Sequence, residues 1–228
     1  MNISRLLSVA PMMERTDRHC RYFFRLLSQQ TLLYSEMINA NAITKGNKTR
    51  LLNFSEIEHP LALQIGGSDP KLLAEATKIG VDWGYDEINL NVGCPSSRVS
   101  SGDFGAVLMK RKDHVAKCVD AMAQFSSNVP ISVKCRIAVD DQDPEKILPS
   151  FIKTVSNSGV SIFIIHARKA ILSGLSPKDN RKIPPIDYNL VKKIKTQFPQ
   201  LEICLNGEIK DLSTVMNFIN DGINGCMI

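Results

Sequence analysis

LALQIGGSDPKLLAEATKIG, residues 61–80, predicts one β-strand followed by one α-helix. Leu61–Ile65 is a short apolar run, and Pro70–Lys78 has the apolar spacing of an amphipathic helix. Asp69 directly before Pro70 is typical of a helix N-cap with proline at the first helical position. A strand, a turn and a helix in this order form the repeating unit of a parallel sheet with crossover helices.

The same unit recurs along the chain and predicts an α/β fold, a (β/α)8 TIM barrel. The expected strands are Leu7–Met12, Thr31–Ile38, Leu61–Ile65, Glu87–Val92, Ile131–Ile137, Ser161–Ala167, Leu201–Leu205 and Gly225–Ile228. The expected helices are Asp17–Gln29, Pro70–Lys78, Lys112–Phe125, Pro144–Ser158, Tyr188–Phe198 and Leu212–Ile219. Eight strands in 228 residues suit one barrel domain over residues 1–228, since such barrels take about 250 residues. A doubly wound sheet would need a glycine fingerprint after its first strand, where the chain has Ala10–Met13.

Two local features complete the fold prediction. In the first expected helix, Cys20, Phe23, Phe24 and Leu27 recur at i, i+3, i+4 and i+7, which predicts a buried apolar face. The eighth expected strand reaches Ile228, so we expect the barrel to lack its final covering helix.

Composition limits the class of protein. With 43% hydrophobic and 22% charged residues, the chain has an ordinary globular composition, and no run approaches the roughly 18 apolar residues of a membrane span. The first residues lack the features of a signal peptide. Six scattered cysteines, without CxxC pairs or zinc spacing, predict reduced thiols, a cytoplasmic protein and no metal site. The net charge of +5 suits an anionic partner such as nucleic acid, nucleotide or phosphorylated substrate.

Polar residues follow the expected strands, at the end where barrels place their chemistry. They are Gln64, Asn91, Cys94, Lys134, Arg136, His166, Arg168 and Asn206–Glu208, together with Pro11–Met13 after the first strand. Each one alone is ordinary, but at one barrel mouth they predict a single site. Asn206-Gly207-Glu208 precedes a short helix, so its backbone N–H groups and the helix start predict a phosphate site.

Several long motifs resemble the tRNA-dihydrouridine synthases, most of all their A-type bacterial branch. They are SVAPMMERTDRHCRYFFRLLS, LALQIGG, NLNVGCPSSRVSSGDFGAVLM, SVKCRI, IIHARKAILSGLSPKDNRKIPPIDY and LNGEIKD. The resemblance extends from about Ser8 to the end of the chain. The resemblance implies an FMN enzyme that reduces the C5–C6 double bond of a D-loop uridine of tRNA, in the position-20 region. NADPH would be the reductant.

The resemblance also implies roles for single residues. Cys94 would be the general acid that protonates C5 of the uracil, and Asn91 would contact the target nucleotide. The flavin ring would lie against Pro11, Met12 and Met13 and contact Gln64, Lys134 and His166, with its phosphate at Asn206, Gly207 and Glu208. Lys178 and Arg181 would contact the tRNA. A thiol pKa near 8.5 keeps most of a cysteine protonated at neutral pH, as a proton donor requires. For Cys20, Cys118, Cys135 and Cys204 we expect a buried structural role.

Three readings of the chain's function remain open. Members of the family continue with a Gly-Arg phosphate turn, a last helix and a helical tRNA-binding domain. The chain is therefore either a dihydrouridine synthase or a truncated, non-catalytic remnant with at most weak RNA or flavin binding. A flavin oxidoreductase of a free pyrimidine is the third reading, and the basic stretch Lys178–Lys182 argues against it. We expect a monomer without a membrane partner.

Overall fold

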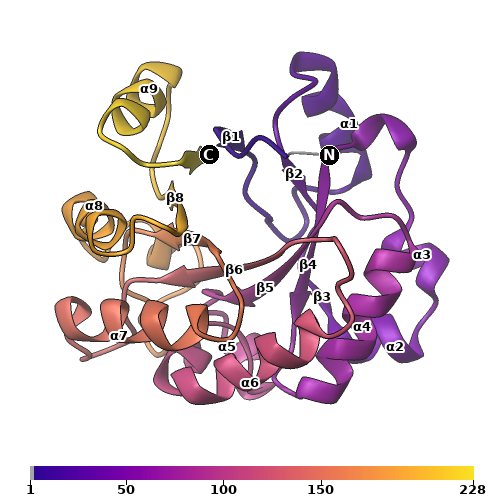
Figure 1. The fold of residues 1–228 in the computed structure, drawn as a ribbon, viewed down its shortest axis with the longest axis horizontal. Helices are drawn as coiled ribbons and strands as arrows, with labels where there is room; N and C mark the ends of the chain where they lie inside the picture. The colour runs from indigo at the N-terminus through magenta and orange to yellow at the C-terminus, as the bar shows by residue number, and fades with distance from the viewer. Residues whose placement is uncertain (1–2) are drawn as a thin grey trace.

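The fold is a nearly closed barrel of parallel strands, described over residues 3–228 of a computed structural model (Figure 1). The strands are β1 (Leu7–Ser8), β2 (Leu33–Tyr34), β3 (Ile38–Asn39), β4 (Leu61–Gly66), β5 (Glu87–Val92), β6 (Ile131–Arg136), β7 (Ile162–His166), β8 (Glu202–Asn206) and β9 (Gly225–Met227). They pair in the order β1-β9-β8-β7-β6-β5-β4-β2, and β3 also pairs with β4. A single bridge between Ser8 and Leu32 joins the two ends of this sheet. The predicted TIM barrel is confirmed.

Helices cover the outside of the barrel (Figure 1). The α-helices are α1 (Arg18–Leu27), α2 (Ala40–Lys45), α3 (Lys48–Leu52), α4 (Pro70–Asp82), α5 (Ser97–Ser101), α6 (Lys112–Ala123), α7 (Pro144–Ser156), α8 (Tyr188–Gln197) and α9 (Leu212–Asn220). Three short 3-10 turns are η1 (Glu56–Glu58), η2 (Gly105–Lys110) and η3 (Asp179–Arg181). Asp69 caps α4 as predicted, and Asp143 caps α7 in the same way; both side chains accept backbone N–H groups of the first turn. Across residues 3–228, none of the helices has the length and apolarity needed to cross a bilayer.

The first two predicted strands are too long. The run Leu7–Met12 forms a ladder only at Leu7 and Ser8. Thr31–Ile38 divides into β2 and β3 at Ser35. Its N–H still donates to the carbonyl of Ala62, but its hydroxyl accepts the N–H of Gln64 and donates to the carbonyl of Glu36. Apolar content alone does not show where a strand stops pairing.

The predicted buried face of α1 is wrong. Phe23 and Leu27 are 57% and 67% exposed, and the other two apolar positions are only partly covered. The helix turns Arg21 and Arg25 inward instead, and they are only 6% and 4% exposed. Arg21 Nε donates to the buried carboxylate of Glu58 over 2.6 Å, which fixes the inward face. Periodicity reveals two faces of a helix, but the partner of a buried charge decides which one faces the core.

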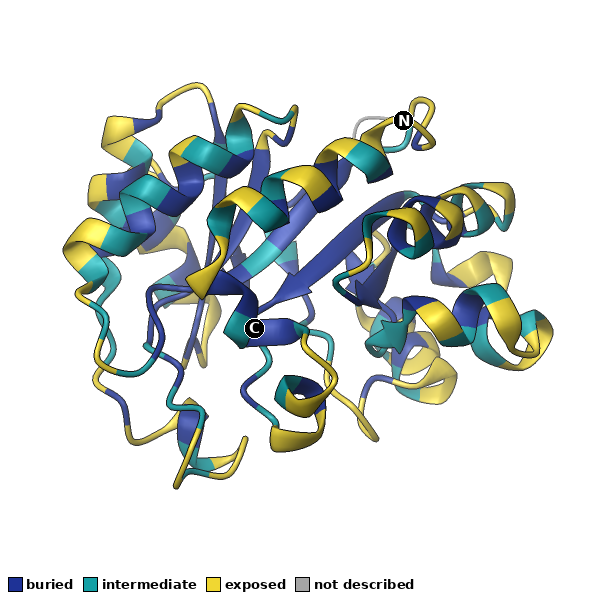
Figure 2. Ribbon diagram, turned by 90° about the horizontal axis from the view of Figure 1, so that it is seen from below, coloured by how far each residue is buried: buried dark blue, intermediate teal, exposed yellow. Residues whose placement is uncertain are grey.

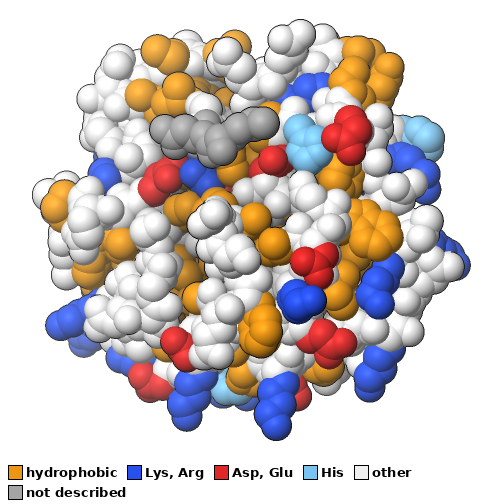
Figure 3. Space-filling view, turned by 45° about the vertical axis from the view of Figure 1, so that its right-hand side comes forward, with side chains coloured by type: hydrophobic (Ala, Val, Ile, Leu, Met, Phe, Trp, Pro, Cys, Tyr) orange, Lys and Arg blue, Asp and Glu red, His pale blue; other side chains and the backbone are white. Residues whose placement is uncertain are grey.

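Exposed apolar side chains border the junction of β9 and β1. They include Tyr22, Phe23, Leu26 and Leu27 of α1, and Leu212 and Met216 of α9. Figure 1 shows α1 and α9 at the two sides of this junction, and Figure 3 shows hydrophobic side chains along the upper edge of one face. In the described part of the chain, β9 is the last element, so no helix among these residues follows it.

The core has two layers. The larger one lies between strands and helices and takes alternate strand residues such as Leu61, Leu63 and Ile65. The smaller one includes Ile162, Ile164, Cys204 and Met227, which point into the barrel. Figure 2 shows buried strands at the centre and helices that are exposed only on their outer faces. Buried polar residues, among them Gln64, Asn89 and Asn91, also lie in the barrel interior.

Candidate active site at the barrel mouth

The carboxyl ends of the strands bring polar side chains from three strands together. Lys134 Nζ at the end of β6 donates to Asn206 Oδ1 at the end of β8 over 3.0 Å. Asn206 Nδ2 in turn donates to the carbonyl of Met227 on β9 over 2.8 Å. His166 is 6% exposed at the end of β7 and is aligned with Asn206 in the sheet. The structure therefore places Lys134, His166 and Asn206 at one mouth.

Cys94 lies on a turn directly after β5, and side-chain and backbone contacts hold that turn. Asn91 Oδ1 accepts the backbone N–H groups of Gly93 over 3.2 Å and Cys94 over 3.0 Å. The carbonyl of Cys94 accepts the N–H of Ala106 over 2.9 Å. Gly105 has a φ of +76°, and a Cβ there would lie 2.7 Å from the Cys94 carbonyl oxygen. The thiol thus sits on a closely packed turn, half-buried at the mouth.

Burial and the nearby charges act on the thiol in opposite directions. Burial raises the pKa of Cys94, while the N–H of Ser96 and the cations Arg136, Lys134 and Arg181 counteract this rise. A raised pKa leaves the thiol protonated at neutral pH, with a proton to donate. Three nearby cations would stabilise the thiolate that remains after the proton has left.

Burial also lowers the pKa values of two neighbours of the thiol, Lys134 and His166. It lowers the pKa of Lys134 to about 8, with the charge of Arg136 as the second cause. It also lowers the pKa of His166 far below its usual range, and the nearby cations add to that effect. At neutral pH the imidazole is therefore neutral, while Lys134 carries a charge at a high cost in solvation.

The turn after β8 differs in part from the predicted phosphate site. Gly207 has a φ of +123°, and a Cβ there would lie 2.7 Å from His166 Cδ2, so only glycine fits. The Glu208 carboxylate pairs with Arg168 and with Lys210. The start of α9 is not open to an anion, because Asp211 accepts the N–H of Thr214 over 2.7 Å. The predicted phosphate site therefore depends mainly on the backbone around Gly207.

The other predicted residues surround the mouth. Met12 and Met13 follow β1 and are 39% and 57% exposed, and Pro11 precedes them. Lys178 and Arg181 are exposed at η3, in the long connection between β7 and α8. Gln64 is 1% exposed inside the barrel. Two cavities, of about 210 Å³ beside α1 and about 190 Å³ between η2 and α7, lie away from these side chains.

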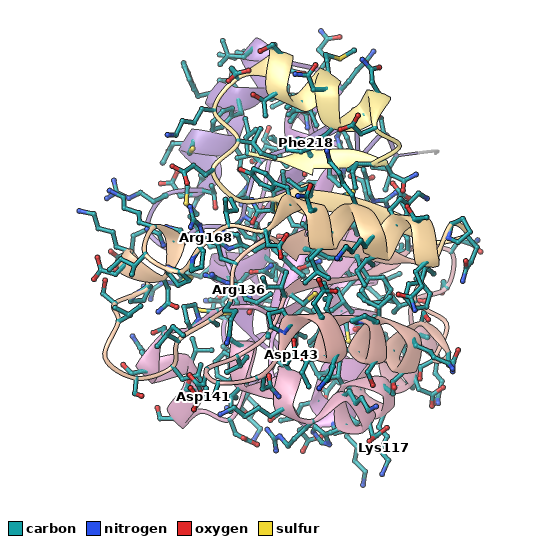
Figure 4. All side chains as sticks on the ribbon, turned by 90° about the vertical axis from the view of Figure 1, so that its left-hand side faces the viewer. Lys117, Arg136, Asp141, Asp143, Arg168 and Phe218 are labelled. Atoms are coloured by element: carbon teal, nitrogen blue, oxygen red, sulfur yellow. The ribbon has the colours of Figure 1, made fainter. Side chains whose placement is uncertain are left out.

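Arg136 has a larger role than its place in the sequence indicated. Its Nε donates to the carbonyl of Gly93 over 3.2 Å, and its Nη1 donates to those of Lys169 over 3.2 Å and Asn180 over 2.9 Å. It therefore ties the thiol turn to the loop after β7. Arg168 lies close to it, and both are labelled in Figure 4. The alternation in ISVKCRI puts Arg136 on the same strand face as Lys134, a signal that was present in the sequence.

Comparisons with known proteins agree with the motifs. A family model described as Dihydrouridine synthase (Dus) matches residues 8–228. A tRNA-dihydrouridine(20/20a) synthase of Synechocystis sp. is 56% identical over 214 residues, covering 94% of this chain and 64% of that protein. One of Escherichia coli is 58% identical over 206 residues, covering 90% of this chain and 59% of that protein. The chain thus spans about three fifths of the length of these relatives.

Solved structures share the fold at low identity. The crystal structure of TcOYE with pHBA is 9% identical with a TM-score of 0.67, covering 97% of this chain and 84% of that one. Morphinone reductase in complex with tetrahydroNAD is also 9% identical, with a TM-score of 0.64 and coverage of 98% and 82%. These two likenesses concern the barrel alone. Since the family model matches nearly the whole chain, the chain belongs to the dihydrouridine synthase family.

Proposed function

We propose that this chain is the catalytic barrel of an FMN-dependent tRNA-dihydrouridine synthase. It would reduce the C5–C6 double bond of a D-loop uridine in the position-20 region of tRNA, with NADPH as reductant. The family membership and the names of the relatives, tRNA-dihydrouridine(20/20a) synthases, support this assignment.

The position of the Cys94 thiol at the barrel mouth is the observation that carries the proposal. The thiol sits on a turn at the mouth, half-buried, with its pKa raised by burial. Reduction of the uracil double bond needs a proton at C5, and a positioned acid of suitable pKa supplies one. A target base must leave its stack to reach such a thiol, which suits a residue on a projecting turn. Cys94 would donate the proton, and Arg136, Lys134 and Arg181 would stabilise the thiolate left behind.

The residues of the mouth fit a flavin phosphate and ring. Among residues 3–228, Lys134 Nζ has one recorded acceptor, Asn206 Oδ1, although an ammonium offers three donors. Arg168 Nε is a buried donor without a partner in the same part of the chain. Pro11, Met12, Met13, Gln64, Lys134 and His166 would hold the ring, and Asn206, Gly207 and Glu208 the phosphate end. When bound, the flavin supplies the hydride for C6.

An exposed basic loop supports the tRNA part of the proposal. Lys178 and Arg181 lie at its surface, next to the mouth, where they would contact phosphates. Asn91 would contact the target nucleotide through the one amide N–H that its protein contacts leave free. A cytoplasmic monomer completes the proposal, and the free thiols suit a reducing compartment.

The test combines flavin retention with turnover. The purified protein is given FMN, dialysed, and examined by its visible spectrum. It is then mixed with NADPH and tRNA that lacks dihydrouridine. We expect a retained, perturbed flavin spectrum and dihydrouridine in the tRNA. Loss of flavin on dialysis together with no dihydrouridine would refute the proposal in favour of the non-catalytic remnant. Reduction of free uracil without reduction of tRNA would refute it in favour of a pyrimidine oxidoreductase.

A further inference from the structure

A continuous chain of side-chain hydrogen bonds runs through the barrel interior to the thiol turn. Its members are at most 7% exposed, apart from the half-buried cysteine at the end. In order they are Glu87, Ser132, Asn89, Gln64, Asn91 and Cys94, and we call them the polar column. The column passes from β5 to β6, back to β5, then to β4 and back to β5, so it links three neighbouring strands.

Each contact in the polar column has one donor and one acceptor. Ser132 Oγ donates to Glu87 Oε1 over 2.5 Å, and Asn89 Nδ2 donates to Ser132 Oγ over 2.7 Å. Gln64 Nε2 donates to Asn89 Oδ1 over 2.8 Å, and Asn91 Nδ2 donates to Gln64 Oε1 over 2.8 Å. Asn91 Oδ1 is then left to accept the N–H groups of the thiol turn.

The groups at each end of the column independently determine the donor-to-acceptor direction of its hydrogen bonds. At the inner end, the Glu87 carboxylate accepts from the Arg5 guanidinium over 2.7 Å and from the Tyr34 hydroxyl over 2.7 Å. An ionised carboxylate only accepts, so the single hydroxyl proton of Ser132 must point toward it. At the outer end, backbone N–H groups only donate. Both ends therefore require the same orientation of every amide between them.

We propose that the polar column positions Cys94 for proton transfer, with Asn89 and Ser132 as positioning residues that reach the turn through Gln64 and Asn91. This rests on the function proposed above. A barrel interior does not need these groups for packing, since Ile162, Ile164 and Met227 fill another part of it with apolar side chains. Buried amides are costly unless they are hydrogen-bonded, and in the column each amide nitrogen donates to one side chain and each amide oxygen accepts, which holds each amide in one orientation.

Asn89→Asp tests the proposal with almost no change in shape. The aspartate still accepts from Gln64, but it places an acceptor opposite Ser132 Oγ, whose proton faces Glu87. We expect a looser thiol turn. Iodoacetamide should alkylate Cys94 at least about threefold faster than in the parent, because one hydrogen bond changes an equilibrium by roughly a factor of five. Dihydrouridine formation at saturating tRNA should fall about tenfold, with KM for tRNA little changed.

Asn224→Asp is the matched control, because Asn224 Oδ1 accepts the backbone N–H of Ile203 over 2.9 Å, as an aspartate also would, and has no other donor among residues 3–228. Its alkylation rate and turnover should equal those of the parent. Ser132→Ala breaks the same column without adding charge and should also speed alkylation. It therefore serves as the test variant if Asn89→Asp fails to fold. Alkylation needs neither tRNA nor flavin, so it tests the column even where the parent does not reduce tRNA. Parent-like alkylation in both column variants would overturn the proposal.

Discussion

Replacing Lys134 by methionine should stabilise the flavin-free protein at neutral pH. Burial lowers the pKa of Lys134 from 10.5 to about 8, so the folded protein holds this ammonium less readily than the unfolded chain does. A lysine with a lowered pKa destabilises the fold at every pH below that value. The penalty is relieved as pH rises from about 8 toward 10.5, because only the unfolded chain then still binds the proton.

The structure sets the size of this effect. The shift corresponds to about 3 kcal/mol at ~1.36 kcal/mol per pKa unit, and partial solvent access of the side chain reduces it to about 2 kcal/mol. Loss of the hydrogen bond to Asn206 takes back about 1 kcal/mol. The free energy of unfolding should therefore rise by about 1 kcal/mol at pH 7, which raises Tm by roughly 2–4 °C in a domain of this size.

Thermal unfolding followed by circular dichroism, at pH 7 and at pH 9.5, measures the difference between variant and parent. We expect a higher Tm for Lys134→Met at pH 7 and a smaller or reversed difference at pH 9.5. The same variant should retain less FMN after dialysis, since its mouth has lost a cation. A variant less stable than the parent at pH 7, or a Tm difference that does not change with pH, would refute the reasoning.

Three further substitutions test single contacts by urea unfolding. Gly207→Ala should cost about 2–4 kcal/mol, because a positive φ and a Cβ 2.7 Å from His166 are both unfavourable; a cost below about 1 kcal/mol would show that the ring moves aside. Arg21→Met should cost about 3–5 kcal/mol, because it leaves the Glu58 carboxylate buried without its partner. Leu27→Gln, at a position 67% exposed on the same helix, should change stability by less than about 0.5 kcal/mol. The reverse order of the two α1 variants would contradict the inward face that the structure assigns to this helix.

The fold was predictable because its repeating unit is local. Asp69 and Pro70 define a helix start within a few residues, and the alternation of apolar runs and amphipathic helices identifies the barrel. The orientation of α1 was not predictable, because it depends on a carboxylate at Glu58 that lies 37 residues away in the chain. The division of Thr31–Ile38 likewise depends on a contact between Ser35 and β4. Contacts between residues far apart in the chain do not appear in the periodicity of the sequence.

The sequence indicated which residues lie together at the site, but it said less about the contacts that each one makes. Strand ends identify Cys94, Lys134 and His166, because parallel strands in a barrel end at one mouth. The partners of the Asn91 amide depend on side chains of neighbouring strands, so its hold on the thiol turn required the structure. The capped start of α9 is different, because Asp211 before the helix was visible as an N-cap in the sequence.

Dihydrouridine formation by the parent, Cys94→Ala and Cys20→Ala proteins tests the central claim most directly. Each protein is loaded with FMN and NADPH and given unmodified tRNA in a single-turnover assay. Cys20 is half-buried on α1 and is not among the proposed site residues, so it serves as the matched control. We predict that Cys94→Ala slows the reaction by at least about 100-fold, the contribution expected of a general acid, while Cys20→Ala matches the parent. Parent-like rates for Cys94→Ala would contradict the assignment of this thiol as the proton donor.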